Sequence, residues 1–378
     1  MWEGRVCVRE CRMALTTYVK GRAYDWSHAI GRASANGTGF NYPQTMCLGN
    51  DGDIYVANRG NENNFGMRVN HIKVGGAGDE ELLAEFATYG DKDENCVWPF
   101  GVAAGKNGEV YVTDEWKSTV SVFDSKGKFI RKWGTPGSGP GELKGPAGIV
   151  CEAGGNLIVV DSGNNRLQVF TPEGKLVTQC GKAGNGEAEF NKPWGIALDK
   201  DGNIYVADWK NHRVQKLSPS GKFLMSIGRY GKLPVAPNAF AVTYLGPFIA
   251  SAPDTERAPA GILNHPTGVA IDPDGDIYVT DWGNHRLCIF DKDGRPLTHL
   301  VGDAQVMSKW GQQSIDANPD MMKAYRRVQN LEQLWRFCFP TAVVFDSKTD
   351  QIIVADSQRN RLQVYKKVRD YVDFQANL

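Results

Sequence analysis

The chain has 378 residues, of which 41% are hydrophobic and 23% are charged, a composition typical of a globular protein with a buried core. Its 43 basic and 43 acidic residues give a formal net charge of zero, so no overall field favours nucleic acid or an anionic membrane as a partner. No run of about 18 apolar residues is present, so no membrane span is expected.

The N-terminal stretch and the cysteines favour a cytoplasmic location. Charged residues interrupt positions 1–22 every few residues, and the apolar core of a secretory signal is missing. The eight cysteines are scattered, and Cys7 and Cys11 have no second pair with which to form a zinc site. We therefore expect reduced thiols in a cytoplasmic protein.

The first predicted strands lie in ALTTYVKGRAYDWSHAIGR, which starts at Ala14. This stretch is comparable to RLQVFTPEGKLVTQCG further along the chain, where a tight turn separates two apolar runs. It looks like a third- and fourth-strand pair, and we expect it to complete a sheet begun at the other end of the chain.

From Asn41 onward one pattern recurs six times. A clear copy is PWGIALDKDGNIYVADWKNHRVQKLSPSGKFLMSIG, residues 193–228. The copies begin at Pro43, Pro99, Pro146, Pro193, Pro266 and Pro340. The intervals between these prolines are 56, 47, 47, 73 and 74 residues, and a base period near 47 residues indicates a propeller or a solenoid.

Each full copy predicts four antiparallel strands. Runs of valine, isoleucine, tyrosine and phenylalanine are separated by turns such as DPDG and PSGK. One such sheet cannot bury both of its faces alone, whereas six sheets around an axis can. The last copy ends after its third strand, RLQVYKK, so the N-terminal segment is expected to close the ring. We predict one all-β, six-bladed propeller domain over residues 1–378.

These motifs resemble those of the NHL-repeat family of six-bladed propellers. Pro-x-Gly-Val/Ile-Ala, Tyr-Val-x-Asp and Asn-x-Arg-Val/Leu-Gln recur, in whole or in part, in six copies over nearly the whole chain. The resemblance implies the fold. It does not choose a function, because the family includes enzymes, scaffolds, sensors and RNA binders.

The aspartates that end the second strands are predicted to be structural. They are Asp114, Asp161, Asp208, Asp281 and Asp356, with Asn58 in the first copy. Four of them are followed five residues later by an arginine: Arg166, Arg213, Arg286 and Arg361. Residues that recur in most blades usually have a structural role that all blades share. We therefore interpret each aspartate–arginine pair as a link to a neighbouring segment. His212 and His285 share one repeated slot and are discounted as ligands for the same reason.

The large insertions are predicted to lie on one face, because strand direction places the loops from strand two to three and from blade to blade together. They are NRGNENNFGMRVN, the stretch around residues 75–95, residues 229–263 and residues 302–338. Such long loops are usually functional. Residues 229–263 are expected to form an apolar covering loop.

Residues 302–338 are predicted to form a helical lid over the axis. Asp316 or Asn318 would cap a helix that has Pro319 in its first turn. An apolar stripe follows at helical spacing: Met322, Tyr325, Val328, Leu331, Trp335 and Phe339.

Positions beside the blade-starting prolines and the recurring aspartates form the candidate site. The predicted substrate-binding residues are Tyr42, Trp98, Lys117, Trp194, Trp209, Trp282 and Phe339. The aromatic rings either pack beneath a lid or form the wall of a ligand pocket. The predicted catalytic residues are His265 and Glu115, for proton transfer, and Arg59, to hold an anionic group.

No metal site is evident, and no cofactor is required. Peptidyl-hydroxyglycine amidating lyases, which share this NHL-like fold, bind zinc through histidines directly after the first-strand proline. Those positions here hold Gln44, Phe100, Ala147, Trp194, Thr267 and Thr341. In gluconolactonase-like propellers an axial carboxylate–asparagine set binds a divalent cation, to which Asn58 and Glu115 would correspond. A divalent metal, calcium or zinc, in the central channel therefore stays open.

Two functions are compatible with these residues. The first is an enzyme, a lyase or hydrolase, that acts on a small molecule in a lidded, aromatic-walled axial pocket. The alternative is a non-catalytic NHL propeller that binds a protein or peptide on the same face. RNA binding needs a basic face, which the interleaved acidic residues disfavour.

Overall fold

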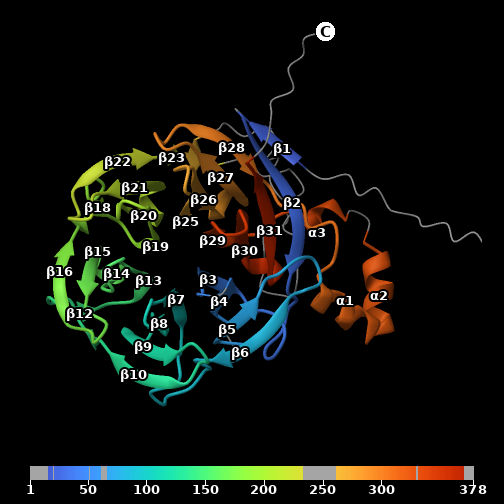
Figure 1. Ribbon diagram of the computed structural model, residues 1–378, viewed down its shortest axis with the longest axis horizontal. Coiled ribbons are helices and arrows are strands. Elements are labelled where there is room, and N and C mark those ends of the chain that lie inside the picture. The colour runs from blue at the N-terminus through green and yellow to red at the C-terminus, as the bar shows by residue number, and fades with distance from the viewer. Residues whose placement is uncertain are drawn as a thin grey trace, which may run out of the picture.

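Six sheets stand around a central axis in the computed structural model (Figure 1), which describes residues 16–19, 21–50, 52–60, 66–232, 261–328 and 331–369. Five of these sheets have four antiparallel strands and one has five. The predicted all-β, six-bladed propeller is confirmed.

Blades 1 to 3 are built from consecutive antiparallel strands. Blade 1 consists of β3 (Pro43–Leu48), β4 (Asp53–Asn58), β5 (Arg68–Lys73) and β6 (Glu81–Phe86). Blade 2 consists of β7 (Pro99–Ala104), β8 (Glu109–Asp114), β9 (Thr119–Asp124) and β10 (Phe129–Trp133). Blade 3 consists of β13 (Pro146–Cys151), β14 (Leu157–Asp161), β15 (Arg166–Phe170) and β16 (Leu176–Cys180).

Blades 4 and 5 repeat this order, and blade 6 combines both ends of the chain. Blade 4 consists of β19 (Pro193–Leu198), β20 (Ile204–Asp208), β21 (Arg213–Leu217) and β22 (Phe223–Ile227). Blade 5 consists of β25 (Pro266–Ile271), β26 (Ile277–Asp281), β27 (Arg286–Phe290) and β28 (Pro296–Leu300). Blade 6 consists of β29 (Pro340–Asp346), β30 (Gln351–Asp356), β31 (Arg361–Val368), β2 (Arg22–Ile30) and β1 (Thr16–Val19).

Short parallel strand pairs support three of the connections between blades. They are β11 (Thr135–Pro136) with β12 (Glu142–Leu143), β17 (Lys182–Ala183) with β18 (Glu189–Phe190), and β23 (Arg229–Tyr230) with β24 (Ile262–Leu263). Each pair holds the connecting segment next to the blade that follows it in the chain.

The core lies between neighbouring blades. All five residues of β20 are buried, as expected for a strand covered on both faces, whereas burial in the outermost strand β22 is partial. Glycines of the innermost strands allow the blades to approach closely at the axis. A Cβ atom on Gly148 would lie 2.6 Å from the carbonyl oxygen of Trp194, and one on Gly195 would lie 2.3 Å from that of Thr267. This close approach explains the recurring Pro-x-Gly motif.

The N-terminal segment closes the ring as predicted and adds one further strand. The strand β2 pairs with β31, so β31 is the third strand of blade 6, β2 is the fourth and β1 is a fifth. The segment thus forms a fourth and a fifth strand and not a third and a fourth, because the long C-terminal strand already supplies the third.

An ion cluster fixes the closed ring to blade 5. Lys367 of β31 lies 2.5, 2.8 and 2.9 Å from the carboxylates of Asp272, Asp274 and Asp276. Arg22 of β2 donates two hydrogen bonds to Asp276, at 2.6 and 2.8 Å. Both ends of the chain are therefore held by the same turn of blade 5.

The two faces of the ring carry different loops. We call the face with the loops from strand two to three and from blade to blade the upper face, and the opposite face, with the short turns, the lower face. The stretch around residues 75–95 was predicted to lie wholly in a connection between blades. It instead contains β6, so residues 74–80 form a turn on the lower face.

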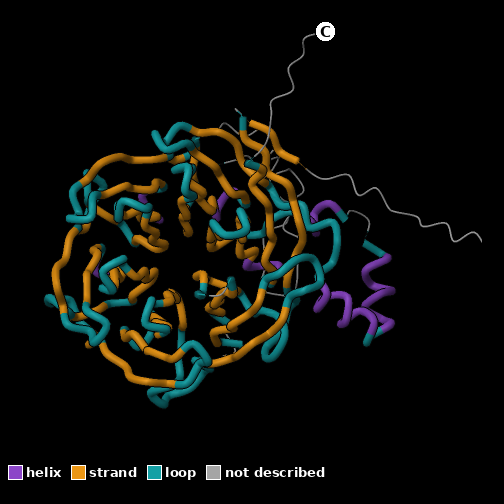
Figure 2. Tube along the Cα trace, viewed as in Figure 1, coloured by secondary structure: helices purple, strands orange, loops and turns teal. Residues whose placement is uncertain are grey.

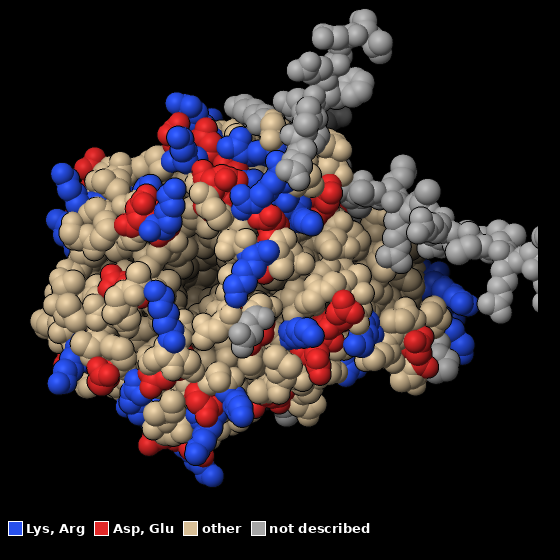
Figure 3. Space-filling view, viewed as in Figure 1, with Lys and Arg blue, Asp and Glu red and all other residues tan. Residues whose placement is uncertain are grey.

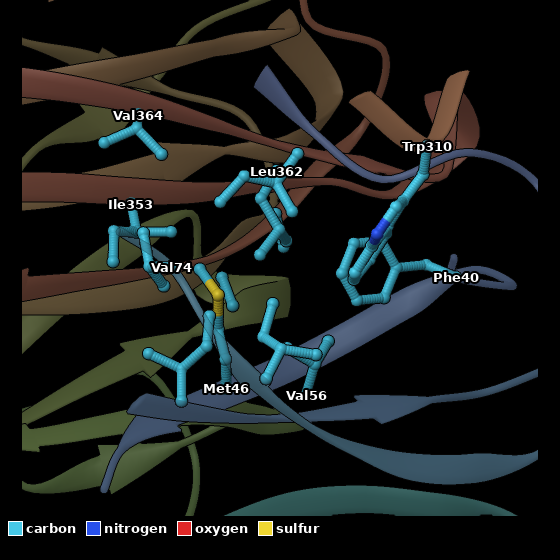
Figure 4. Close-up of a cluster of buried hydrophobic side chains, with 13 residues drawn as sticks. Phe40, Met46, Val56, Val74, Trp310, Ile353, Leu362 and Val364 are labelled. Carbon is cyan, nitrogen blue, oxygen red and sulfur yellow. The ribbon is translucent and has the colours of Figure 1, made fainter. Parts of the chain in front are cut away.

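The helical insertion lies on the outer circumference and not over the axis, so the predicted lid is wrong (Figures 1 and 2). Its helices are α1 (Lys309–Asp316), α2 (Pro319–Arg326) and α3 (Glu332–Trp335). The Trp310 side chain of α1 is 3% exposed and packs into the cluster between blades 6 and 1, with its ring centroid 6.1 Å from that of Phe40 (Figure 4). Burial of the Trp310 side chain between blades 6 and 1 stabilises α1 on the circumference and not over the axis.

Two further expectations concern the insertions. Asn318 caps α2, accepting a hydrogen bond from the Asp320 N–H, and Pro319 occupies the first turn. The predicted covering loop of residues 229–263 lies mostly outside the described residues, which stop at 232 and resume at 261.

In the described parts of the chain, no helix has the length and apolar character needed to cross a membrane.

Candidate ligand-binding face

The recurring aspartates are fully occupied in holding the blades. Asp161 accepts hydrogen bonds from the Lys144 N–H at 2.7 Å, from Arg166 Nε at 2.8 Å and from Gln168 Nε2 at 3.1 Å. The same three contacts recur at Asp208 and Asp356. Each aspartate thus ties the segment that enters a blade to the third strand of that blade.

A fifth arginine of this kind was not predicted from the sequence. Arg68 stands opposite Asn58, the register that Arg166 has opposite Asp161. The longer loop in blade 1 moves it from five to ten residues beyond the second strand, so spacing alone does not reveal it. Its Nε lies 2.9 Å from Glu85 Oε2.

The repeated histidines join one blade to the next. His212 Nδ1 accepts a hydrogen bond from the His265 N–H at 3.0 Å, and His285 Nδ1 accepts one from the Phe339 N–H at 3.3 Å. In blade 3, Asn165 does the same with its side-chain oxygen. This role requires an unprotonated Nδ1, and burial accordingly lowers the pKa of His285 to about 4.

Arg59 and Glu115 meet at the upper face, between blades 1 and 2. Their side chains form an ion pair and are 29% and 34% exposed. The Arg59 guanidinium lies 4.4 Å from the centre of the Trp98 ring, and Trp98 contacts the outward-facing Trp116 at 4.9 Å. Because the two charges neutralise each other, the cluster presents an aromatic surface with a polar edge.

Lys117 does not belong to this cluster. Its Nζ donates to the carbonyl oxygens of Gly90, Lys92 and Asn95, at 2.9, 3.3 and 3.0 Å. The side chain therefore stabilises the connection before blade 2, and its predicted role in substrate binding is not supported.

A row of aromatic side chains crosses blades 4, 5 and 6. Trp194 and Trp209 stack at 5.0 Å with an interplanar angle of 13°. Trp209 continues to His265 at 4.6 Å and to Trp282 at 6.5 Å, and Trp282 contacts Phe339 at 4.5 Å. All five are only partly buried, so the row offers apolar surface to a ligand. Four of the predicted substrate-binding residues thus lie together.

The predicted acid–base set is not assembled. Glu115 follows the second strand of blade 2, and His265 precedes blade 5, which is opposite in the ring (Figure 1). His265 Nδ1 instead lies 2.9 Å from Asn264 Oδ1, and burial together with His212 and Lys210 lowers its pKa. Tyr42 lies apart from the row, at the junction of blades 6 and 1, where its N–H donates to Asn360.

The central channel is narrow. A cavity of about 50 Å³ is lined by the innermost strands, with Thr45, Gly101, Gly148, Gly195 and Thr341 among its residues. The hydroxyl groups of Thr45 and Thr341 donate to the backbone carbonyls of Phe100 and Pro43. Over the described ranges, no group of three or more His, Cys, Asp or Glu side chains is arranged to hold a metal ion.

Comparison with sequence families identifies the repeat. The NHL repeat model matches residues 143–170, 190–217, 263–290 and 337–365, and a model described as a 6-bladed beta-propeller matches residues 93–150. The RING finger protein nhl-1 of Caenorhabditis elegans is 42% identical over 60 residues, which are 16% of this chain and 6% of the nematode protein. The match therefore spans a small part of this chain and a smaller part of that relative.

Solved structures share the fold at low sequence identity. A structural genomics protein from Bacteroides thetaiotaomicron has a TM-score of 0.57 at 18% identity, over 92% of this chain and 76% of that chain. Virginiamycin B lyase from Staphylococcus aureus has a TM-score of 0.50 at 14% identity, over 90% of this chain and 98% of that chain. The four matched repeats and the six sheets together establish that this chain is a six-bladed β-propeller that contains NHL repeats.

Proposed function

We propose that this propeller is a binding module whose upper face recognises an extended peptide segment with apolar or proline side chains. The observation that carries the proposal is the aromatic row from Trp194 to Phe339. Its ring contacts run without a break across three blades. A strip of this shape suits an extended peptide, and proline-rich segments dock on surfaces lined with aromatic rings.

Polar side chains lie elsewhere on the same face. Arg59 and Glu115 lie across the axis from it, partly exposed and paired with each other. An apolar centre with a polar rim is the usual composition of a protein interface. Figure 3 shows the opposite, lower face, where basic and acidic side chains are interspersed around the central hollow.

The alternative is a lyase or hydrolase that acts on a small molecule at the same face. Such an enzyme needs its proton-transferring groups together at the reacting bond. Glu115 is paired with Arg59, and His265 lies on the opposite side of the ring. The likeness to virginiamycin B lyase concerns the fold alone. The geometry therefore favours binding over catalysis.

Selection from a display library of short random peptides on the full chain tests this proposal. Selected peptides should be rich in proline, leucine and aromatic residues. Trp209→Ala and Trp282→Ala should each weaken their binding by about 2 kcal/mol, or roughly thirtyfold in Kd, as expected for central interface tryptophans. Trp116→Ala is the matched control, because Trp116 lies on the same face but outside the row and is 64% exposed.

Two outcomes would contradict the proposal. One is a set of selected peptides whose affinity is insensitive to both row substitutions. The other is turnover of lactone or ester substrates that is lost in Arg59→Ala and unaffected by the row, which would favour the enzyme. The proposed module needs no metal, so a chelator should leave the peptide affinity unchanged.

A further inference from the structure

A second cavity lies on the circumference, where the helical insertion meets blade 6. Its volume is about 210 Å³, and it is lined by the end of β2, by residues 304–308, by α2 and α3 and by the loop that follows β30. A cavity of about 150 Å³ is large enough to hold a benzene ring. This cavity therefore has room for a ring with a short substituent.

Three arginines line this circumferential cavity, and only one of them is paired. Arg361 is neutralised by Asp356, whose carboxylate lies 2.8 Å from its Nε. Arg32 donates to the Thr38 carbonyl and to Ser314, and Arg359 donates to the Gln333 carbonyl at 2.7 Å. No carboxylate among the described side chains pairs with Arg32 or Arg359. Two positive charges thus border the cavity without an anion.

Arg359 also has an unused donor. Its Nε is buried and has no hydrogen-bond partner in the described parts of the chain. A buried donor without an acceptor is unfavourable, and a guanidinium presents its donors in a fork that matches a carboxylate. Because this Nε is screened from solvent, an anionic ligand in the cavity would neutralise the guanidinium charge rather than bond to Nε itself.

The remaining lining is largely apolar. Met307, Tyr325, Leu334 and Trp335 contribute side chains from the insertion. We propose that the circumferential cavity binds a small organic carboxylate with an aromatic or branched apolar body, held by Arg32 and Arg359 through its carboxylate and by these side chains through its body. The site is separate from the aromatic row and does not depend on the peptide-binding proposal.

Isothermal titration of the full chain with phenylacetate tests the site, with phenylacetamide as its neutral counterpart. Phenylacetate should bind saturably, with one ligand per chain, and the amide at least tenfold more weakly, because a charged hydrogen bond is lost. Arg359→Gln and Arg32→Gln should each weaken phenylacetate binding at least tenfold. Arg295→Gln is the matched control, since Arg295 is 71% exposed and lies on a lower-face turn.

The comparison of acid and amide uses the unaltered chain, so it holds even where a variant is unstable. Equal binding of the two compounds, or no saturable binding of phenylacetate, would overturn the proposal. So would full affinity in both folded arginine variants. Trp209→Ala should leave phenylacetate binding unchanged, which separates this site from the peptide-binding face.

Discussion

Blades 3 and 4 differ from blades 1 and 2 in how they hold the segment that enters each blade. In blades 3 and 4 one buried aspartate binds an arginine, a glutamine and the backbone of that segment. In blade 1 the neutral Asn58 takes the place of the aspartate, and Arg68 turns to Glu85 and to the carbonyls of residues 34–39. In blade 2, Asp114 faces Thr119, so the arginine is absent.

The blades also differ in the residues that they carry at the upper face. In blades 3 and 4 the recurring aspartate, arginine and glutamine side chains form hydrogen bonds with one another and with the backbone. In blades 1 and 2 the aspartate–arginine pair is absent, and charged residues that occur only once, Arg59 and Glu115, meet beside Trp98. The aromatic row, by contrast, crosses blades 4 to 6, where the aspartate–arginine pair is kept.

The largest effect should come from breaking the charged network. Asp281→Ala would leave the fully buried Arg286 without its carboxylate, and we expect the free energy of unfolding to fall by about 3–5 kcal/mol. Asn58→Ala should cost less, about 1–2 kcal/mol, because only neutral hydrogen bonds are lost. Urea denaturation measures both, with the exposed Asp293→Ala as control. Equal losses at Asp281 and Asn58 would refute the distinction between the blades.

A slightly smaller effect is expected where the insertion is anchored. Trp310→Ala removes the side chain that α1 buries between blades 6 and 1. We expect a loss of about 3 kcal/mol, at the low end for a buried tryptophan, because the insertion can detach while the ring stays folded. Hydrogen exchange should rise in residues 302–328 and not in blade 3. A uniform rise in all blades would show that the insertion is part of the ring's stability.

Acid should weaken the junctions that use histidine more than those that use asparagine. The pKa of His285 is about 4 in the folded chain, below its usual 6.5. The unfolded chain therefore takes up the proton first, and stability falls as pH drops from 6.5 towards 4. Between pH 7 and pH 5 the loss should be about 2 kcal/mol. His285→Asn should remove this part of the pH dependence, because Asn165 fills the same slot in blade 3. An unchanged pH profile in the variant would contradict this role.

The smallest effect is expected at the upper-face ion pair. Glu115→Gln should change the free energy of unfolding by less than about 1 kcal/mol, because both side chains are partly exposed and screened by solvent. The thermal midpoint, compared at low and high salt, measures this change. A loss as large as that of Asp281→Ala would place the pair within the structural network.

The repeat made most of the fold predictable from the sequence. Six blade starts, four strands in each copy and closure by the N-terminal segment follow from local patterns that recur. The structural role of the aspartates follows from the same recurrence. Arg68 was not predicted because a longer loop changed its spacing, and the place of β1 as a fifth strand was not predicted because no other copy contains one.

The candidate site was predictable only in part. Trp209 and Trp282 occupy one repeat position, and Trp194 and Phe339 each lie next to a blade-starting proline. Because the repeat fixes these positions on the upper face, the four rings lie close together. Glu115 and His265 do not meet, since residues on opposite blades stay apart whatever their chemistry.

By itself, the sequence determined the blades and their order, because these depend on strand pairing between residues near in the chain. Tertiary structure alone decided where the helical insertion packs. Its apolar stripe specifies burial but no partner, and the surface between blades 6 and 1 that accepts Trp310 exists only once the ring has closed. The same closure brings Arg32 and Arg359, far apart in the chain, to one cavity.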